Sequence, residues 1–240
     1  MINKKYILLI FISCLFCAES IALATKVKGS VLYKKKKEKQ LKNELKVGSD
    51  LYNSDYIRTG DDGFAKYVYL DDGTQIKIHN NTEVFVHGEL KRRSILKQLK
   101  VKDGTVKLDV KKQAVDEFTV ITPTSVASVK GTSFWLDCSG KGGDKFYGES
   151  GIVSITNIAS GIKRQLAKNT VASSSPDGRL DLREITPNEL KMLEQIESET
   201  GEADGSINQQ EGSAVGNESE IRIELEDESG NQKIIIIKVR

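Results

Sequence analysis

The sequence predicts an all-β fold of short antiparallel strands, arranged as a sandwich or as a twisted, solenoid-like stack, with one short helix and a C-terminal β-hairpin. From Thr25 onward, apolar and polar residues alternate with a period of two, which is typical of half-buried strands. Short strands also recur directly after a glycine turn, at a spacing too irregular for a strict repeat. These units are DDGTQIKI (71–78), KDGTVKLDV (102–110), ESGIVSIT (149–156) and PDGRLDL (176–182).

Helical signals are confined to residues 186–200. Thr186 is a suitable N-cap, Pro187 fits the first turn, and Glu189 completes a capping box. Apolar residues at three-residue steps form the predicted contact face of this helix: Leu190, Leu193 and Ile196.

The segments after the helix have contrasting compositions. Residues 201–220 are polar and rich in Gly, Ser and Glu, so we predict a disordered acidic linker. Residues 221–240 read as two strands around an Asp-Glu-Ser-Gly turn and predict a β-hairpin. Its second strand is apolar on both faces at Ile234–Ile237, so we expect it to be covered by the chain's own sheet or by another protein.

The N-terminal 24 residues have the features of a secretory signal. Lys4 and Lys5 precede an apolar run over residues 6–16, and residues 22–24 supply the small residues of a cleavage site after Ala24. The run is shorter than the ~20 apolar residues that span a bilayer. We therefore predict export to a bacterial periplasm or envelope, or secretion. An uncleaved anchor and a lipidated cysteine are the alternatives.

The cysteines agree with export. Cys14 and Cys17 lie in the predicted signal, which leaves Cys138 in the mature chain. One cysteine forms no intrachain disulfide, so the fold depends on its apolar core. Cys138 shares the strand parity of Leu136, which predicts a buried structural thiol.

The formal net charge of +2 conceals an asymmetry. Residues 25–112 contain 21 Lys/Arg and 12 Asp/Glu, a net charge of +9, whereas residues 113–240 contain 13 Lys/Arg and 21 Asp/Glu, a net charge of −8. The basic runs at 34–39 and 91–93 are predicted to be solvated hairpin ends, since lysines at edges protect strands from pairing. The halves either attract each other or face different partners.

The segment TPTSVASVKGTSFWLDC (122–138) changes parity at Gly131-Thr132. Ala127 and Val129 share one strand face, whereas Phe134 and Leu136 have the opposite parity. An extra residue at a bulge or sharp bend near Gly131 would return both sets to one core, and glycine tolerates such a bend. Trp135 is predicted to be packing rather than a sugar-stacking residue.

This segment resembles the signature of the FecR-domain family, with Gly131, Thr132 and Phe134 as structural signature residues. The resemblance extends over about residues 25–157, within a β domain predicted to span 25–185. Further family features occur in the family's order: Gly29–Val31, Val47–Leu51, Asp55–Gly60, Ala65–Ile78, Asp103–Val106, Phe118–Pro123 and Gly148–Val153.

The resemblance implies an exported β-rich module, which in the best-known members relays a signal from an outer-membrane receptor to a sigma factor. Only residues 1–5 precede the apolar run, so we expect no cytosolic anti-sigma segment. The leading hypothesis is a non-enzymatic module that binds an envelope protein or ligand, with sheet edges available for strand addition. The alternative is an adhesive envelope protein that contacts anionic polymer or lipid through its basic N-terminal half. Neither hypothesis involves nucleic acid, and membrane contact would be peripheral or through an uncleaved signal anchor.

Catalytic and metal-binding readings have little support, and no cofactor is predicted. His79 is expected to face solvent, His87 to lie at a strand end, and no nucleophile motif surrounds Cys138 for a Cys–His dyad. The acidic pairs at 61–62 and 71–72 lack the alternating spacing of a calcium loop and are predicted to be turn residues. A hydrolase is therefore the third and weakest class.

Overall fold

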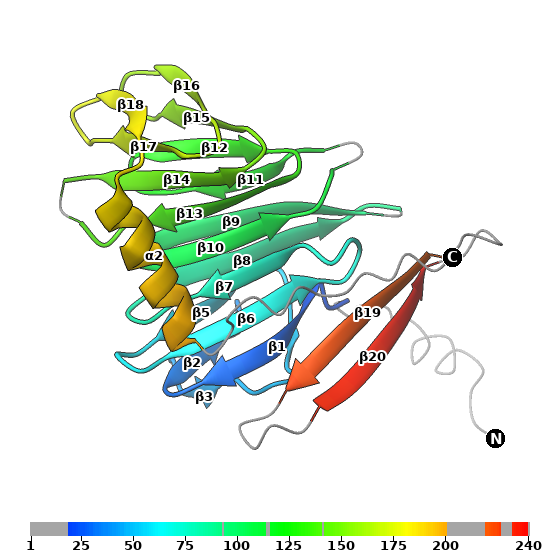
Figure 1. Cartoon of the computed structure of the whole chain (residues 1–240). Helices are drawn as coiled ribbons and strands as arrows, with labels where there is room; N and C mark the ends of the chain where they lie inside the picture. The colour runs from blue at the N-terminus through cyan, green and yellow to red at the C-terminus, as the bar shows by residue number, and fades with distance from the viewer. Residues whose placement is uncertain are drawn as a thin grey trace, which may run out of the picture.

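The computed structural model describes residues 19–92, 94–113, 116–140, 142–200, 219–226 and 232–239. These residues form two nine-stranded sheets, a separate two-stranded sheet and the helix α2 (Pro187–Glu199), as Figure 1 shows. The prediction of an all-β sandwich with one short helix and a C-terminal hairpin is confirmed.

Sheet A, which lies nearer the viewer in Figure 1, follows the chain almost in order from one edge to the other. Its strands are, in spatial order, β4 (Asp50–Leu51), β1 (Ala22–Lys28), β6 (Phe64–Tyr69), β7 (Gln75–Ile78), β10 (Thr105–Val110), β13 (Thr132–Asp137), β14 (Asp144–Ser150), β17 (Thr170–Ser174) and β18 (Leu180–Glu184).

Sheet B faces sheet A and has the same progression along the chain. Its strands are, in spatial order, β3 (Asn43–Glu44), β2 (Val31–Lys34), β5 (Asp55–Thr59), β8 (Glu83–Leu90), β9 (Ile95–Asp103), β11 (Phe118–Ile121), β12 (Ser125–Val129), β15 (Val153–Asn157) and β16 (Lys163–Leu166). The pair β9–β11 is parallel, and the other pairs are antiparallel.

The main core lies between the two sheets. Alternate residues of each strand point into it, as Val106 and Leu108 do from β10 and Leu99 and Val101 do from β9. The period-two alternation of the sequence therefore places one face of each strand out of water, where each fully buried aliphatic side chain contributes about 1.5–3 kcal/mol.

The parity change at Gly131 has a simple structural cause. β12 belongs to sheet B and β13 to the facing sheet A, so the chain turns through Lys130–Gly131 from one layer to the other. This turn is why Ala127 and Phe134 both reach the shared core, as predicted. The predicted bulge or bend of a single strand is a corner between sheets instead. Gly131 adopts φ +130° at this corner. The pairing of β13 with β14 is irregular slightly later in the chain, between Ser133 and Phe134.

Helix α2 packs on the outer face of sheet A. Its predicted capping box is present, because the Thr186 side chain accepts from the backbone N–H of Glu189 and the Glu189 side chain accepts from that of Thr186. A second apolar cluster joins the helix to the sheet: Trp135, Tyr147, Val171 and Leu193, with Ile185 and Ile196 at its margin. Trp135 is thus a packing residue, as predicted. The predicted three-residue contact face is wrong at Leu190, which is 42% exposed.

The start of β1 overlaps the predicted signal-cleavage site after Ala24. Residues 21–24 are buried, and the backbone N–H of Ile21 donates to Leu51 O at 2.9 Å while that of Ala24 donates to Ser49 O at 3.0 Å. A cut after Ala24 would remove this buried segment of β1. Export and cleavage remain predictions, but the structure favours a cut upstream of Ile21. Within the described residues, no helix has the length and apolarity to cross a membrane.

The C-terminal hairpin consists of β19 (Ser219–Glu226) and β20 (Gln232–Val239). β19 lies beside β1, as Figure 1 shows. Ile234 and Ile236 are 54% and 48% exposed, so the chain's own sheets do not cover these two residues, and cover by another protein stays a prediction. β19 begins two residues earlier than predicted, and the linker prediction otherwise concerns residues 201–218, which lie outside the described part of the chain.

Candidate binding face

A continuous row of cross-strand partners crosses the outer face of sheet B. Lys34 pairs with Tyr56, Tyr56 with Phe85, and Phe85 with Lys100. Beyond Lys100, the row of cross-strand partners continues with one residue from each of β11, β12, β15 and β16. We call it the Lys34 row, and its members are Lys34, Tyr56, Phe85, Lys100, Ile121, Val126, Thr156 and Lys163.

A second row runs beside the first, two residues along each strand. Uncharged groups that donate and accept hydrogen bonds share it, and we call it the His87 row: His87, Gln98, Thr119, Ser128, Ser154 and Gln165. Burial, and then the charges of Lys100 and Lys36, lower the pKa of His87, so its imidazole is neutral at neutral pH. The Oγ of Ser154 is buried and has no hydrogen-bond partner among the described residues.

Aromatic rings and lysines are interleaved at the β2 end of this face. The rings of Tyr56 and Phe85 have centroids 4.9 Å apart. Lys34 Nζ lies 5.5 Å and Lys102 Nζ lies 5.8 Å from the Tyr56 centroid, within the range of cation–π attraction. Glu83, a carboxylate beside Tyr56, is already engaged by Lys102 at 2.9 Å and by Arg58 at 3.7 Å. The pKa of Glu83 is lowered by its hydrogen bonds from Lys102 and Tyr56.

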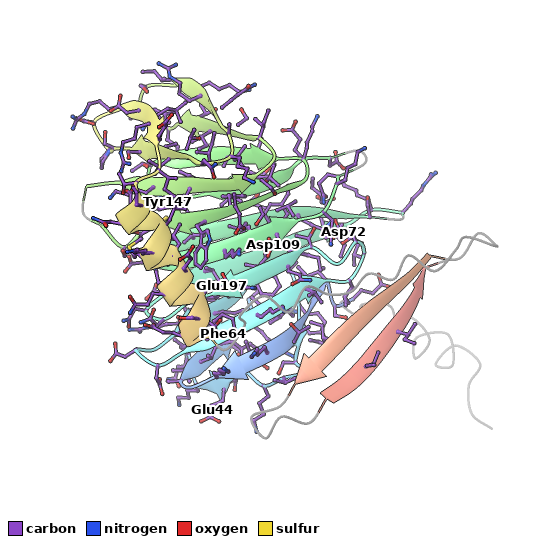
Figure 2. The ribbon with its side chains drawn as sticks, in the orientation of Figure 1. Glu44, Phe64, Asp72, Asp109, Tyr147 and Glu197 are labelled. Atoms are coloured by element: carbon purple, nitrogen blue, oxygen red, sulfur yellow. The ribbon has the colours of Figure 1, made fainter. Side chains whose placement is uncertain are left out.

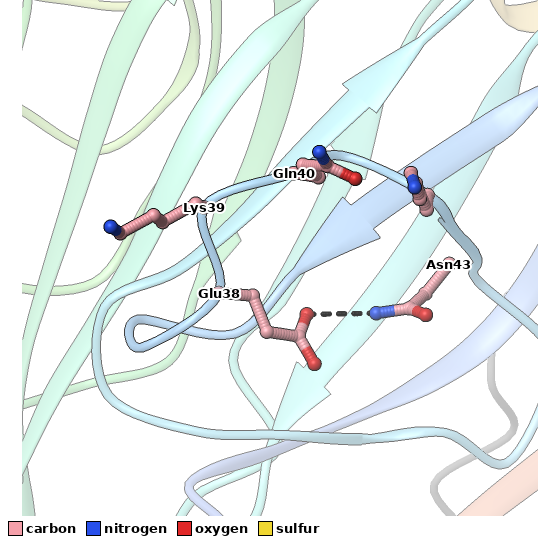
Figure 3. A pocket seen from close by; sticks show the side chains of 5 residues that line it. Glu38, Lys39, Gln40 and Asn43 are labelled. Carbon is pink, nitrogen blue, oxygen red and sulfur yellow. Dashed lines mark hydrogen bonds between the residues drawn. The ribbon is translucent and has the colours of Figure 1, made fainter.

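The loop that precedes β3 forms a shallow hollow beside this end of the face. Figure 3 shows the Glu38 carboxylate accepting a hydrogen bond from Asn43 Nδ2, at 2.8 Å, and Lys35 N donates to the same carboxylate at 3.0 Å. Residues 35–39 are exposed, in agreement with the predicted solvated hairpin end. Because its carboxylate serves the loop itself, the hollow is not a separate binding site.

The acidic pair Asp71-Asp72 has a role that the turn prediction missed. Lys97 is 3% exposed, and its Nζ lies 2.6 Å from Asp71 Oδ2 and 2.9 Å from Asp72 Oδ2. Gln113 completes the cluster by donating to Asp72 at 2.6 Å. A buried lysine requires such partners. Lys97 occupies the same alternate positions of β9 as the buried residues Ile95 and Leu99, so the sequence places its side chain on the inner face, where a lysine needs acidic partners.

The residues considered for nucleophilic chemistry are structural. Burial, and next Asp144, raise the pKa of the Cys138 thiol, so it stays protonated, which is the opposite of an activated thiolate. Asp144 itself accepts from the side chain of Thr122 and the backbone N–H of Thr124. Cys138 is a buried free thiol, as predicted.

The solvent-facing prediction for His79 is wrong. His79 is 2% exposed, and its ring stacks on Trp135 with centroids 4.9 Å apart. His79 does point to the outer face of sheet A, as its parity indicates, but its ring stacks on Trp135, which packs against α2. His87 lies within β8 rather than at its end, and its Nδ1 is 3.2 Å from Ser54 Oγ.

Ion pairs also join helix α2 to sheet A. Figure 2 places Tyr147 and Glu197 near opposite ends of the helix. Glu197 pairs with Lys77 and, at 3.2 Å, with Lys107. Within the described residues, no group of three or more His, Cys, Asp or Glu side chains is placed to hold a metal ion.

Comparison with known proteins supports the family resemblance. Residues 55–146 match the model of the family described as FecR protein, so the predicted resemblance is confirmed over β5 to the middle of β14. Comparison with curated proteins gives no match. Two crystal structures of a candidate anti-sigma factor from Parabacteroides distasonis ATCC 8503, at 2.50 and 1.65 Å resolution, are similar with 17% identity and a TM-score of 0.48. Each match covers 58% of this chain and 64%, less than two thirds, of that chain.

Proposed function

We propose that this chain is an exported, non-enzymatic module that binds another envelope protein and takes part in signal relay. The observation that carries the proposal is the FecR match over residues 55–146, which coincides with the central strands of the sandwich. The protonated, buried state of Cys138 gives no support to a hydrolase.

The C-terminal hairpin is the surface that we assign to the protein partner. β20 hydrogen-bonds to β19 on one side and to no other described strand. Ile234 and Ile236 are exposed on it, and an exposed apolar edge strand readily accepts a further strand from another chain. A partner that adds a strand to β20 would also cover the two isoleucines.

In vivo photocrosslinking tests this assignment. A photoreactive residue at Ile236 should trap a defined envelope protein, whereas the same residue at Leu190, which is similarly exposed on α2, should not. Ile236→Lys should weaken capture from a probe at Ile234, because it places a charge in an apolar contact. Identical products from positions 236 and 190, or no protein product from either hairpin position, would exclude the hairpin as the partner surface.

A further inference from the structure

We propose that the outer face of sheet B binds a linear acidic glycan that lies across the strands. This ligand goes beyond the protein partner proposed above and uses a different surface. Helix α2 packs on sheet A, whereas the members of the Lys34 row are half-buried or exposed, apart from Tyr56, which Phe85 and the lysines cover.

The geometry of the two rows suits an extended polymer. Cross-strand partners repeat at the strand spacing of ~4.8 Å, so the seven steps from Lys34 to Lys163 span about 34 Å. Half-exposed apolar side chains recur along this length at Phe85, Ile121 and Val126. Such side chains offer a floor for the C–H faces of sugar rings, as aromatic and aliphatic groups do at binding surfaces.

The charges of the Lys34 row indicate an acidic ligand with repeated charge. Lys34, Lys100 and Lys163 stand at the start, the middle and the end of the row rather than in one cluster. Lys102 adds charge beside Tyr56, and it already offsets Glu83. A ligand with one acidic group would meet one lysine, whereas a polymer with regularly placed carboxylates would meet all three.

The His87 row favours a glycan over an acidic peptide. Its hydroxyls, amides and neutral imidazole both donate and accept hydrogen bonds, as sugar hydroxyls require. An extended peptide gains most from main-chain pairing at a strand edge. The strands under this face have both neighbours in place, from β2 to β15, so the face presents side chains only.

Binding of the full chain to three probes of matched charge tests the proposal. The probes are polygalacturonate, polyglutamate and vesicles containing phosphatidylglycerol, with methyl-esterified polygalacturonate as the neutral control. Polygalacturonate should bind at least tenfold more tightly than the ester, the peptide polymer or the vesicles, and added salt should weaken it. Equal or tighter binding to polyglutamate or vesicles, or no binding to polygalacturonate, would overturn the proposal.

Two sets of variants separate charge from sugar recognition. Lys100→Gln with Lys163→Gln should reduce polygalacturonate affinity at least tenfold, whereas Lys145→Gln with Lys168→Gln, which alters exposed lysines elsewhere, should leave it unchanged.

Thr119→Val keeps every charge and should reduce affinity for polygalacturonate several-fold without changing any weak binding of polyglutamate. An unchanged polygalacturonate affinity in this variant would refute the role of the His87 row. A urea midpoint equal to that of the parent chain verifies folding. Crosslinking from Ile236 should persist in all these variants. A refutation of the glycan proposal would therefore leave the proposed protein partner at the hairpin unaffected.

Discussion

Replacement of Gly131 by valine should destabilise the protein strongly, because two independent costs meet at the corner between the sheets. Gly131 has φ +130°, a region that β-branched residues avoid, and such backbone strain costs of order 1–3 kcal/mol. A Cβ at this position would also lie 3.1 Å from the Cα of Lys112, so the neighbouring backbone must shift by a few tenths of an ångström to admit it. The middle of the range for backbone strain alone is about 2 kcal/mol.

Urea denaturation measures this loss. With an m-value of about 2 kcal/mol/M, Gly131→Val should lower the unfolding midpoint by about 1 M or more at unchanged slope. Gly48→Val isolates the backbone cost, because Gly48 has φ +83° and no atom within 4 Å of a Cβ. Gly142→Val, at a site without positive φ or close neighbours, should be neutral. A midpoint for Gly131→Val within error of Gly142→Val would refute the account of the corner.

Three further predictions concern α2, the N-terminus and the free thiol. Hydrogen bonds from Arg183, and then from Thr186, hold the pKa of Glu189 at about 2, below its usual 4.5, so the stabilisation of α2 is complete above pH 4.5 and is lost as the pH falls toward 2. Hydrogen exchange of α2 against pH should show this loss, and Glu189→Gln should flatten it; an unaltered profile would contradict the assignment. The mature chain isolated from the envelope should begin upstream of Ile21 by intact mass, and a chain that begins at Thr25 would disprove the structural role of residues 21–24. Cys138 should resist a thiol reagent in the native protein and react fully in urea, because burial raises its pKa and blocks access; rapid native labelling would count against a buried thiol.

Local sequence rules predicted much of the fold. The capping box at Thr186 and Glu189 depends on residues three apart, and the parity change at Gly131 depends on a seventeen-residue segment, 122–138. Both were therefore readable without tertiary information. The parity of Lys97 was also readable, but its inward position makes sense only once Asp71 and Asp72 are seen at its ammonium.

Long-range contacts account for what the sequence did not reveal. The parity of His79 places it on the outer face of sheet A. That face is buried there because α2, more than fifty residues after Trp135 in the chain, packs against Trp135. The Lys34 row requires the register of eight strands, and a slip of one residue in any strand would break it. Alternation within a strand specifies which face a residue occupies, but not which residue of the next strand lies beside it.

The nearly sequential strand order of both sheets has a consequence for folding. Apart from the swaps of β1 with β4 and of β2 with β3, each new strand is added beside an earlier one, so the sandwich lengthens in one direction as the chain proceeds. Contacts then form mainly between neighbours along the chain, as in linear repeat proteins, where stability is a sum of neighbouring interfaces. We expect such a sandwich to unfold locally from its two ends. The amide hydrogens that exchange most slowly should then lie in β7 to β13, midway between the ends.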